Sequence, residues 1–430
     1  MKITLSNKAK HITVFEHQKL KIGDKFKIKG KEFEFTEDQN KKLETFFGDK
    51  GVPYYNLIKN GVKFNKFVGV LQIDGLVIEI LPKADKKEIE DDKTKNKWRD
   101  ILIGMLRAVG AFNIKAPSSS SLSVKSNFLL DLYFELFIKE VEYLYHKGLI
   151  KKYRRTEGNS FALKGNIKFG KHIQKNLVHQ ERFYIDYTTY DKEHLIHRIL
   201  NKTLLLLQVI NSNSALNSRI GNLLLNFPEM KDFKATEAIF DKICFNRKTE
   251  DYRNAIEIAK LLLLNYHPDL SNGSNNVLAL MFDMNLLWEK FIYTSLRKNL
   301  PDGNSITAQT SKYFWRPNKG SRSKMIPDIV INKDIKNEAV VLDTKWKNYD
   351  DKPNPDDLRQ LYVYHEYYYA QKVALVYPGN TNIIPGTYYD YNGKELSNKE
   401  CSVITISTKS SITDWQEEIN AQIFGWINKI

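Results

Sequence analysis

Two acidic residues and one lysine in the carboxy-terminal third of the chain have a spacing that suits chemistry on a phosphate ester. Asp343 and Lys345 lie two positions apart in the apolar run Ala339–Trp346, and Asp328 opens an earlier apolar run. Side chains alternate between the two faces of a strand, so Asp343 and Lys345 share one face. Because burying these charges without a role would be costly, the pattern predicts a functional pair.

Hydrolysis of a phosphodiester supplies such a role. Two carboxylates at short range hold Mg²⁺ through hard oxygen ligands, and the metal polarises the phosphate and lowers the pKa of bound water. A lysine beside them positions that water or helps to deprotonate it, and it offsets developing charge. We therefore predict that Asp328 and Asp343 bind Mg²⁺ while Lys345 assists the attacking water. The structural alternative is a surface turn at Asp328 and an edge-strand ion pair between Asp343 and Lys345.

These residues resemble the motif of the PD-(D/E)xK nucleases, in which a Pro-Asp pair precedes Asp-x-Lys by about fifteen residues. The matching residues are Pro327, Asp328 and Asp343-Thr344-Lys345. Many families of this fold supply a further acidic group near the metal from the preceding helix. Glu289 lies on such an expected helix and is therefore a third candidate metal ligand, with a solvated helix glutamate as the alternative.

Gln360 and Tyr364 extend the resemblance, because they stand four residues apart on the helix expected after the second strand. They are similar to the Gln-x-x-x-Tyr element of the RecB-like branch, which lies beside the catalytic strand and contacts the substrate or the lysine. The resemblance makes Gln360 a candidate catalytic residue and Tyr364 a candidate DNA contact. A surface glutamine and a core tyrosine are the alternatives.

A basic loop leads into the first of the two strands, and cations there would neutralise DNA phosphates beside a cleavage site. Its candidate DNA-binding residues are Arg316, Lys319, Arg322 and Lys324. Three aromatic residues come just before them: Tyr313, Phe314 and Trp315. We expect at least two of these three to be ordinary core.

Local patterns predict the elements that position these residues. The carboxy-terminal part has the order helix, three strands, helix, strand, which is an α/β unit, and a capping box with Gln416 predicts a terminal helix from about Thr413. Residues 1–82 alternate as short strands, and Asp74-Gly75 predicts a type I′ hairpin. A charged, solvated stretch at 84–97, a helix at 98–110 and a flexible Ser patch at 118–121 follow.

We therefore predict a multidomain protein of α/β and α+β class with three consecutive domains. These are a β-rich domain at 1–125, a mixed helical and strand region at 126–275, and the restriction-endonuclease-like α/β nuclease domain at 276–430. The chain is long enough for two or three hydrophobic cores.

Composition is compatible with this assignment. The chain has 66 Lys and Arg against 51 Asp and Glu, a formal net charge of +15, which favours nucleic acid as partner, although a Lys-rich genome is an alternative. The two cysteines, Cys244 and Cys401, lack the spacing of a disulfide framework or a zinc site. Without a signal-peptide pattern or an apolar run long enough to span a bilayer, we expect a cytoplasmic protein with no membrane contact.

Three further segments, in order along the chain, resemble the McrC family. Residues 282–291 are similar to its Phe-Asp-Met-x-x-Leu-(aromatic)-Glu-x-Phe signature. Residues 68–83 are similar to its amino-terminal Gly-Val/Ile and Ile-x-Ile-x-Pro-Lys segment, and 163–167 to its central Leu-(Arg/Lys)-Gly-x-Ile element. An insert at 84–97 and an extended segment after Tyr377 depart from the family pattern.

The resemblance implies the nuclease subunit of a methylcytosine-specific restriction system, acting on DNA that carries the modified base. It also implies a partner, a hexameric McrB-like AAA+ GTPase, whose pore would receive the amino-terminal and central parts of this chain. The chain has no Walker-type Gly-rich phosphate loop, so we expect no nucleotide cofactor of its own. Two alternatives stay open: a nuclease that acts alone or in another defence or repair system, and a non-catalytic activator of a partner NTPase.

Overall fold

A computed structural model describes residues 10–28, 31–73, 76–83, 91–110, 129–268, 276–335, 338–349, 352–409 and 411–428. The chain forms two compact units, the first made of residues 1–113 together with 279–430, and the second of residues 114–278. The sequence predicts three consecutive domains, whereas the backbone groups the first and last segments in one unit. Side-chain contacts between these segments, described below, account for the grouping.

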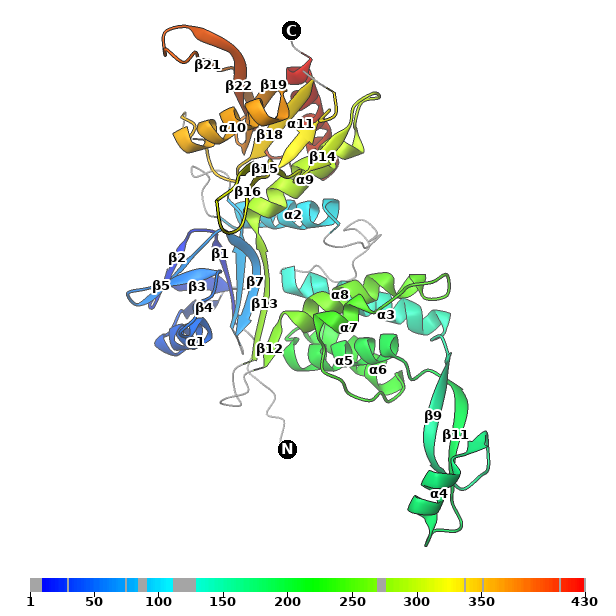
Figure 1. Ribbon diagram of the computed structural model, residues 1–430. Helices are drawn as coiled ribbons and strands as arrows, with labels where there is room; N and C mark the ends of the chain where they lie inside the picture. Colours follow the sequence, from blue (N-terminus) through cyan, green and yellow to red (C-terminus); the bar gives the residue numbers. More distant parts are fainter. Residues whose placement is uncertain are drawn as a thin grey trace. The chain divides into compact units, whose positions relative to one another are not determined.

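The amino-terminal part of unit one is rich in strands, as expected (Figure 1). Its elements are β1 (Lys10–Phe15), β2 (Lys19–Lys21), β3 (Lys25–Ile28), β4 (Lys31–Glu34), α1 (Glu37–Phe47), β5 (Tyr55–Ile58), β6 (Gly61–Phe64), β7 (Phe67–Ile73), β8 (Leu76–Leu81) and α2 (Asp92–Ala108). The main sheet has the order β1-β8-β7-β13, where β13 is Asn276–Asp283. Helix α1 was not expected; Thr36 and Gln39 form a complete capping box at its start.

Antiparallel strands β7 and β8 pair from Gly69 with Ile80 to Ile73 with Leu76. The predicted hairpin is therefore present, although its turn residues, Asp74 and Gly75, lie outside the described residues, as does the Ser118–Ser121 patch. Gly69 has φ +134°, and a Cβ there would lie 2.0 Å from the Leu280 carbonyl oxygen of β13. Only glycine allows β7 and β13 to approach so closely.

The carboxy-terminal part of unit one is the expected α/β layer structure. Its elements are α9 (Met284–Lys298), β14 (Ile306–Ala308), β15 (Lys312–Trp315), β16 (Ser323–Met325), β17 (Ile329–Ile331), β18 (Ala339–Thr344), α10 (Pro355–Tyr368), β19 (Ala370–Pro378), β20 (Asn382–Ile384), β21 (Thr387–Tyr389), β22 (Leu396–Ile406) and α11 (Ile412–Ile427). The sheet order is β14-β17-β18-β19-β22-β20, with β21 also paired to β22. Strands β18, β19 and β22 are parallel, and the edge strands are antiparallel.

Helices cover both faces of this sheet, so its central strands are continuously apolar. Helix α10 packs on β18, β19 and β22, where Leu361 and Tyr364 share a core cluster with Val341 and Val373. Helices α9 and α11 pack against each other and against β18 and β22. The terminal helix starts one residue after Ser411, whose hydroxyl accepts from the Asp414 N–H, so the predicted cap near Thr413 is two residues late.

Buried tryptophans connect the amino-terminal and carboxy-terminal parts of unit one. The Trp346 ring lies 6.4 Å from Trp98 of α2 and 5.3 Å from Trp288 of α9, measured between ring centroids. The Trp346 Nε1–H also donates to Oε1 of Glu16, 2.7 Å away, at the end of β1. Helix α2 begins at Asp92, so the predicted solvated stretch at 84–97 ends six residues too late.

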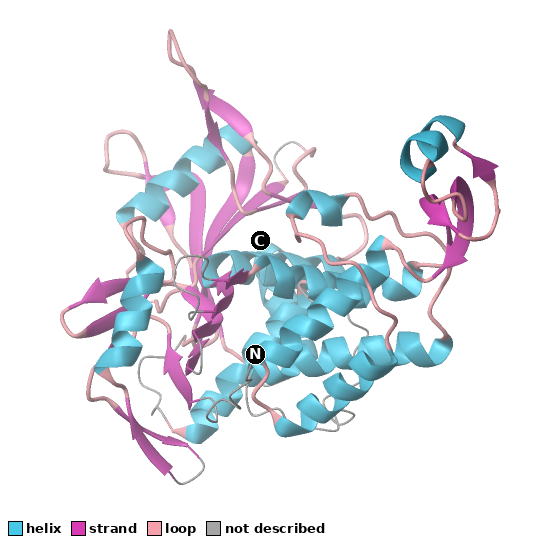
Figure 2. Cartoon of the chain, turned by 90° about the horizontal axis from the view of Figure 1, so that it is seen from below, coloured by secondary structure: helices cyan, strands magenta, loops and turns pink. Residues whose placement is uncertain are grey.

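Unit two combines a helical bundle with a projecting arm (Figures 1 and 2). The bundle elements are α3 (Leu129–Lys147), α5 (Leu195–Ile210), α6 (Ser214–Asn226), α7 (Glu237–Asp241), the 3₁₀ turn η2 (Glu250–Tyr252), α8 (Arg253–Leu264) and β12 (Tyr266–Pro268). The arm elements are β9 (Lys152–Ser160), β10 (Asn166–Ile167), α4 (Phe169–Asn176) and β11 (Phe183–Asp191). In the described part of the chain, no helix is long and apolar enough to cross a bilayer.

Candidate active site

The two candidate catalytic strands, β17 and β18, are neighbours in the sheet. They pair antiparallel, with Ile329 opposite Leu342 and Val330 opposite Val341. Continuing this register by one residue places Asp328 opposite Asp343, and directly opposite residues of an antiparallel pair face the same side. The apolar runs that flank the two aspartates therefore bring two carboxylates together.

Asp328 is fixed by the second strand. Its Oδ2 accepts the Thr344 N–H at 2.6 Å and the Thr344 hydroxyl at 2.8 Å. Burial raises the pKa of Asp328, and the two hydrogen bonds from Thr344 counteract only part of that effect. Thr344, the middle residue of Asp-x-Lys, thus orients Asp328. Strand alternation alone does not predict this contact.

Asp343 is 2% exposed, and its Oδ2 lies 2.6 Å from Nζ of Lys345. The pKa of Asp343 is raised to about 6, first by burial and then by the charge of Asp328, against the lowering effect of Lys345. Burial lowers the pKa of Lys345, but Asp343 and the carboxylates around it outweigh burial and raise that pKa overall. Lys345 is therefore an ammonium ion at neutral pH.

Two further carboxylates lie around this pair. Glu289 of α9 is 8% exposed and accepts from the Gln309 side chain at 2.9 Å. Burial raises its pKa, and the charges of Asp328 and Asp343 add to the rise, so α9 does bring Glu289 into the field of the two aspartates. Asp357 of α10 lies 3.9 Å from Lys345 Nζ.

Asp357 lies in the first turn of α10, where acidic residues interact favourably with the helix dipole. Its Oδ2 lies 2.9 Å from Lys347 Nζ, so the side chain bridges two lysines. Lys345 and Lys347 are two positions apart in the segment that continues β18. This spacing is the only sequence signal for their shared contact with Asp357. We use the name acidic site for Asp328, Asp343, Lys345, Glu289 and Asp357.

Gln360 and Tyr364 lie on α10 as predicted, but they contact each other rather than the lysine. The Gln360 amide donates to the Tyr364 hydroxyl at 2.6 Å, and that hydroxyl donates to the Ile326 carbonyl at 3.1 Å. Gln360 is exposed, whereas Tyr364 is only 3% exposed. Tyr364 therefore supports the segment that enters β17, and its ring has little surface for the DNA contact expected of it.

The four candidate DNA-binding residues lie on or beside a two-stranded ribbon, β15 and β16, and all are exposed: Arg316, Lys319, Arg322 and Lys324. The expectation that the neighbouring aromatic residues are core is wrong. Tyr313, Phe314 and Trp315 are exposed by 55%, 48% and 56%, because a two-stranded ribbon outside the main sheet has no layer to cover its faces.

The donor set of the acidic site fits Mg²⁺. Carboxylate oxygens are the hard ligands that this ion prefers, and proteins commonly supply one or two of them while water and phosphate complete the octahedron. Asp328 and Asp343 provide such a facing pair. Among the residues described, no group of three or more His, Cys, Asp or Glu side chains is gathered tightly enough to hold a metal ion.

Comparison with known proteins shows where this fold and site belong. The sequence model of a family described as McrBC 5-methylcytosine restriction system component matches residues 62–378, well over half of the chain. The chain belongs to this family. The matched region of this McrBC family member contains Glu289 and every other residue of the acidic site.

Individual relatives are distant. The chain is 23% identical over 206 residues to the type IV methyl-directed restriction enzyme EcoKMcrBC of Escherichia coli (strain K12); the match covers 47% of this chain and 57% of that protein. The fold matches a chain of the half-complex from the tetradecameric assembly of Thermococcus gammatolerans McrB AAA+ hexamers with bound McrC, with TM-score 0.72 and 20% identity over 97% of this chain and 100% of that chain. A second structure, of the Thermococcus gammatolerans McrBC complex, matches 68% of this chain and 89% of that chain at 21% identity and TM-score 0.49.

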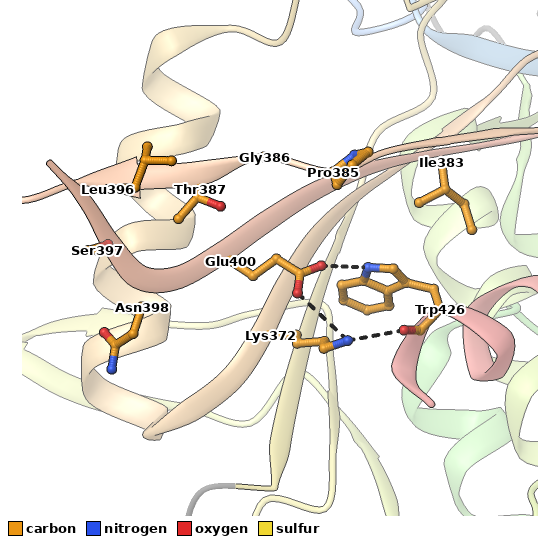
Figure 3. A pocket seen from close by; sticks show the side chains of 10 residues that line it. All are labelled: Lys372, Ile383, Pro385, Gly386, Thr387, Leu396, Ser397, Asn398, Glu400 and Trp426. Atoms are coloured by element: carbon orange, nitrogen blue, oxygen red, sulfur yellow. Dashed lines mark hydrogen bonds and ion pairs between the residues drawn. The ribbon is translucent and has the colours of Figure 1, made fainter. Parts of the chain in front are cut away.

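A separate pocket of about 890 Å³ lies mostly beyond the family match, between β19, β20, β21, β22 and α11 (Figure 3). Lys372 contributes an ammonium 3.7 Å from Glu400 and 3.3 Å from the Trp426 carbonyl oxygen. The Trp426 indole donates to Glu400 at 3.0 Å. Because these charged groups are paired with each other, the pocket does not resemble the acidic site, where carboxylates exceed cations.

Proposed function

We propose that this McrBC family member is the Mg²⁺-dependent DNA endonuclease subunit of a restriction system directed at methylated cytosine. The observation that carries the proposal is the pair of facing carboxylates, Asp328 and Asp343, with the Lys345 ammonium 2.6 Å from the second. This is the arrangement expected of the PD-(D/E)xK hydrolases that the sequence motif resembles. The cytoplasm, where cellular DNA lies, is the proposed compartment.

Asp328 and Asp343 would hold the metal, with Glu289 close enough to influence it electrostatically. Bound Mg²⁺ would polarise the phosphodiester and lower the pKa of a bound water. Lys345, kept protonated by its carboxylate neighbours, would donate hydrogen bonds to the attacking water or to a phosphate oxygen and would neutralise developing charge. Gln360, exposed on α10, would contact the substrate backbone.

The partner proposed for this chain is a hexameric McrB-like AAA+ GTPase. The arm of unit two supports a docking role, because it exposes apolar side chains along its length: Tyr153, Phe161, Leu163, Phe169, Ile173, Leu177 and Val178. The chain lacks a Walker-type loop, so an external motor would supply nucleotide hydrolysis and the recognition of the modified base. The structural relative from Thermococcus gammatolerans is itself assembled with McrB hexamers.

A reconstituted cleavage assay tests the proposal. The purified chain would be mixed with a McrB-like GTPase, GTP, Mg²⁺ and DNA with or without methylcytosine. Asp343→Asn should lower cleavage on the order of 10³-fold, because a ligand of the metal that stabilises transition-state charge is lost, while stimulation of GTP hydrolysis persists. The matched control is Asp356→Asn, which alters an exposed carboxylate of α10 outside the acidic site and should cleave like wild type.

Each outcome of the assay has a defined meaning. Full cleavage by Asp343→Asn overturns the catalytic assignment. Stimulated GTP hydrolysis without any cleavage by the wild-type chain favours the non-catalytic activator instead. Cleavage that needs no GTPase partner favours a nuclease that acts alone.

A further inference from the structure

The aromatic ribbon, residues 312–325, has a surface that the proposed function does not use. It consists of β15, the connecting loop and β16, paired with a register shift between Tyr313 and Trp315. Three consecutive aromatic residues occupy β15, and each exposes about half of its side chain. The register shift interrupts the regular alternation of side chains at Phe314, and all three rings are open to solvent.

The base of this ribbon is fixed, although its aromatic faces are open. The Tyr368 hydroxyl of α10 donates to the Thr310 carbonyl, and Lys312 Nζ donates to the Tyr367 carbonyl at 2.8 Å. At the other end Met325, 5% exposed, belongs to the core cluster beneath α10. Three exposed aromatic rings on a rigidly anchored ribbon have no role in the core, which favours an external partner.

The charge of the ribbon identifies the chemistry of that partner. From Thr310 to Pro327 the sequence holds five Lys and Arg residues and no Asp or Glu. The Arg322 guanidinium lies 5.3 Å and the Lys324 ammonium 5.1 Å from the centre of the Tyr313 ring. Aromatic rings interleaved with cations, without any carboxylate, complement a polyanion that also carries flat ring systems.

The ribbon is also continuous with the acidic site. Its two ends meet there, because the Gln309 N–H donates to the Asp328 carbonyl at 3.0 Å. The Gln309 side chain donates a hydrogen bond to Glu289. The carbonyl of Ile326, one residue after β16, accepts a hydrogen bond from the Tyr364 hydroxyl. Anything bound on the ribbon would therefore lie next to the carboxylates.

We propose that the aromatic ribbon holds a segment of DNA whose bases are unpaired, beside the phosphodiester at the acidic site. Phe314 and Trp315 stack on the exposed bases, and Arg316 and Arg322 contact the backbone phosphates. Bases inside a duplex stack on one another and present only their edges, whereas an unpaired base offers a ring face to an aromatic side chain. This inference rests on the proposed function and narrows its substrate to DNA that is locally opened at the cut.

Tryptophan fluorescence gives a direct readout. All six tryptophans lie in described residues, and five of them are at most 6% exposed, so Trp315 is the exposed one of the six. Single-stranded oligonucleotide, blunt duplex and duplex with an unpaired patch would each be titrated without divalent metal. The single-stranded and patched DNA should quench Trp315 and retain part of their affinity at salt concentrations that release the blunt duplex.

Substitutions of the aromatic rings test stacking directly. Phe314→Ala and Trp315→Ala should each weaken binding of the single strand on the order of tenfold. Trp315→Phe should lose the quench but keep the affinity, because a ring remains. Tyr391→Ala is the matched control, since Tyr391 is 95% exposed outside the ribbon, and it should bind like wild type.

Equal affinity of the ribbon variants and wild type, or a preference for blunt duplex, would overturn the ribbon proposal. Quenching by the GTPase partner but not by any DNA would assign the ribbon to protein docking instead. The two proposals fail separately. If Phe314→Ala and Trp315→Ala cleave like wild type, the nuclease proposal stands and the ribbon proposal fails. If single strands quench Trp315 but the chain cleaves no DNA under any condition, the ribbon proposal stands and the nuclease proposal fails.

Discussion

Unit one buries two sets of charges, and they are composed differently. In the amino-terminal part, Glu79 of β8 is 1% exposed and pairs with Arg99 of α2 through two hydrogen bonds of 2.7 Å and 2.6 Å. The Thr13 hydroxyl donates to the same carboxylate at 3.1 Å. One carboxylate thus meets one guanidinium in a fork-to-fork contact, the geometry that satisfies both groups best.

The acidic site lacks that balance. Three carboxylates, those of Asp343, Asp357 and Asp328, act on Lys345, and both Asp328 and Asp343 have raised pKa values. A strand pair that only needed a stable core would gain from apolar residues at these positions. Burial of charged groups alone therefore does not identify a functional site. An excess of buried carboxylates over buried cations does, because such a site favours the binding of a cation.

The largest expected effect concerns the balanced pair. Arg99→Ala leaves Glu79 buried without its guanidinium, and removing one partner of a buried ion pair costs about 3–5 kcal/mol of unfolding free energy. Urea unfolding followed by tryptophan fluorescence measures this loss, since all six tryptophans belong to unit one. The control is Arg359→Ala, which breaks an exposed ion pair with Asp356 and should have no measurable effect. Equal stability of both variants would contradict the distinction.

The next-largest expected effect on stability concerns a single buried carboxyl that belongs neither to the balanced ion pair nor to the acidic site. Glu16 accepts hydrogen bonds from Trp346 Nε1 and the Lys83 N–H but has no lysine or arginine partner among the described residues. Burial, against these two hydrogen bonds, raises the pKa of Glu16 to about 7. The folded state therefore binds a proton that the unfolded state has released, and stability falls as pH rises from about 4.5 to 7, by about 3 kcal/mol in total.

Glu16→Gln keeps the acceptor oxygen and removes the ionisation. Relative to wild type, this variant should gain stability from about pH 4.5 to pH 7 and level off above that, with little difference at the acid end. Urea unfolding of both proteins at each pH measures the gain. Glu417→Gln, at an exposed carboxylate of α11, should give a flat difference, and a flat difference for Glu16→Gln as well would contradict the prediction.

Local pattern was sufficient to predict part of the site. Strand alternation placed Asp343 and Lys345 on one face, and the apolar stripe of α9 located Glu289. These inferences need only the periodicity of one element or the pairing of two neighbours. The contact of Thr344 with Asp328 depends on the strand register, and the contact of Asp357 with Lys345 depends on where the N-terminus of α10 lies. Neither can be read from the spacing of residues along the chain.

The grouping of residues 1–113 with 279–430 could not be predicted for the same reason. It depends on contacts between distant parts of the chain. One of these joins Trp346 and Glu16, which are 330 positions apart, and neither belongs to a motif that points to the other. The expectation that at least two of Tyr313, Phe314 and Trp315 are core was wrong. Hydrophobic type was taken as a sign of burial, although that relation holds less firmly for a short ribbon with no covering layer. The strands after Tyr377 were missed because their alternation is interrupted by turns.

The smallest expected effect tests the unbalanced site directly. Asp343→Asn removes a buried negative charge that Asp328 repels, so the metal-free variant should be more stable than wild type at neutral pH, by about 1–2 kcal/mol after the loss of attraction to Lys345. The folded pKa of about 6 exceeds the ordinary value of 3.8. Wild type therefore loses stability as pH rises from about 4 to 6, and the advantage of the variant should develop over that range.

Magnesium provides the decisive contrast. Because a cation supplies the charge that the acidic site lacks, added Mg²⁺ should stabilise wild type and leave Asp343→Asn nearly unchanged. Thermal unfolding at pH 7.5, with EDTA and with Mg²⁺, measures both effects in one series, and Glu79→Gln serves as control because it should be destabilised equally with and without metal. The contrary outcome is that Asp343→Asn, without metal, loses as much stability as Glu79→Gln. The carboxylates of the acidic site would then be balanced by their surroundings, and their excess over cations would not indicate function.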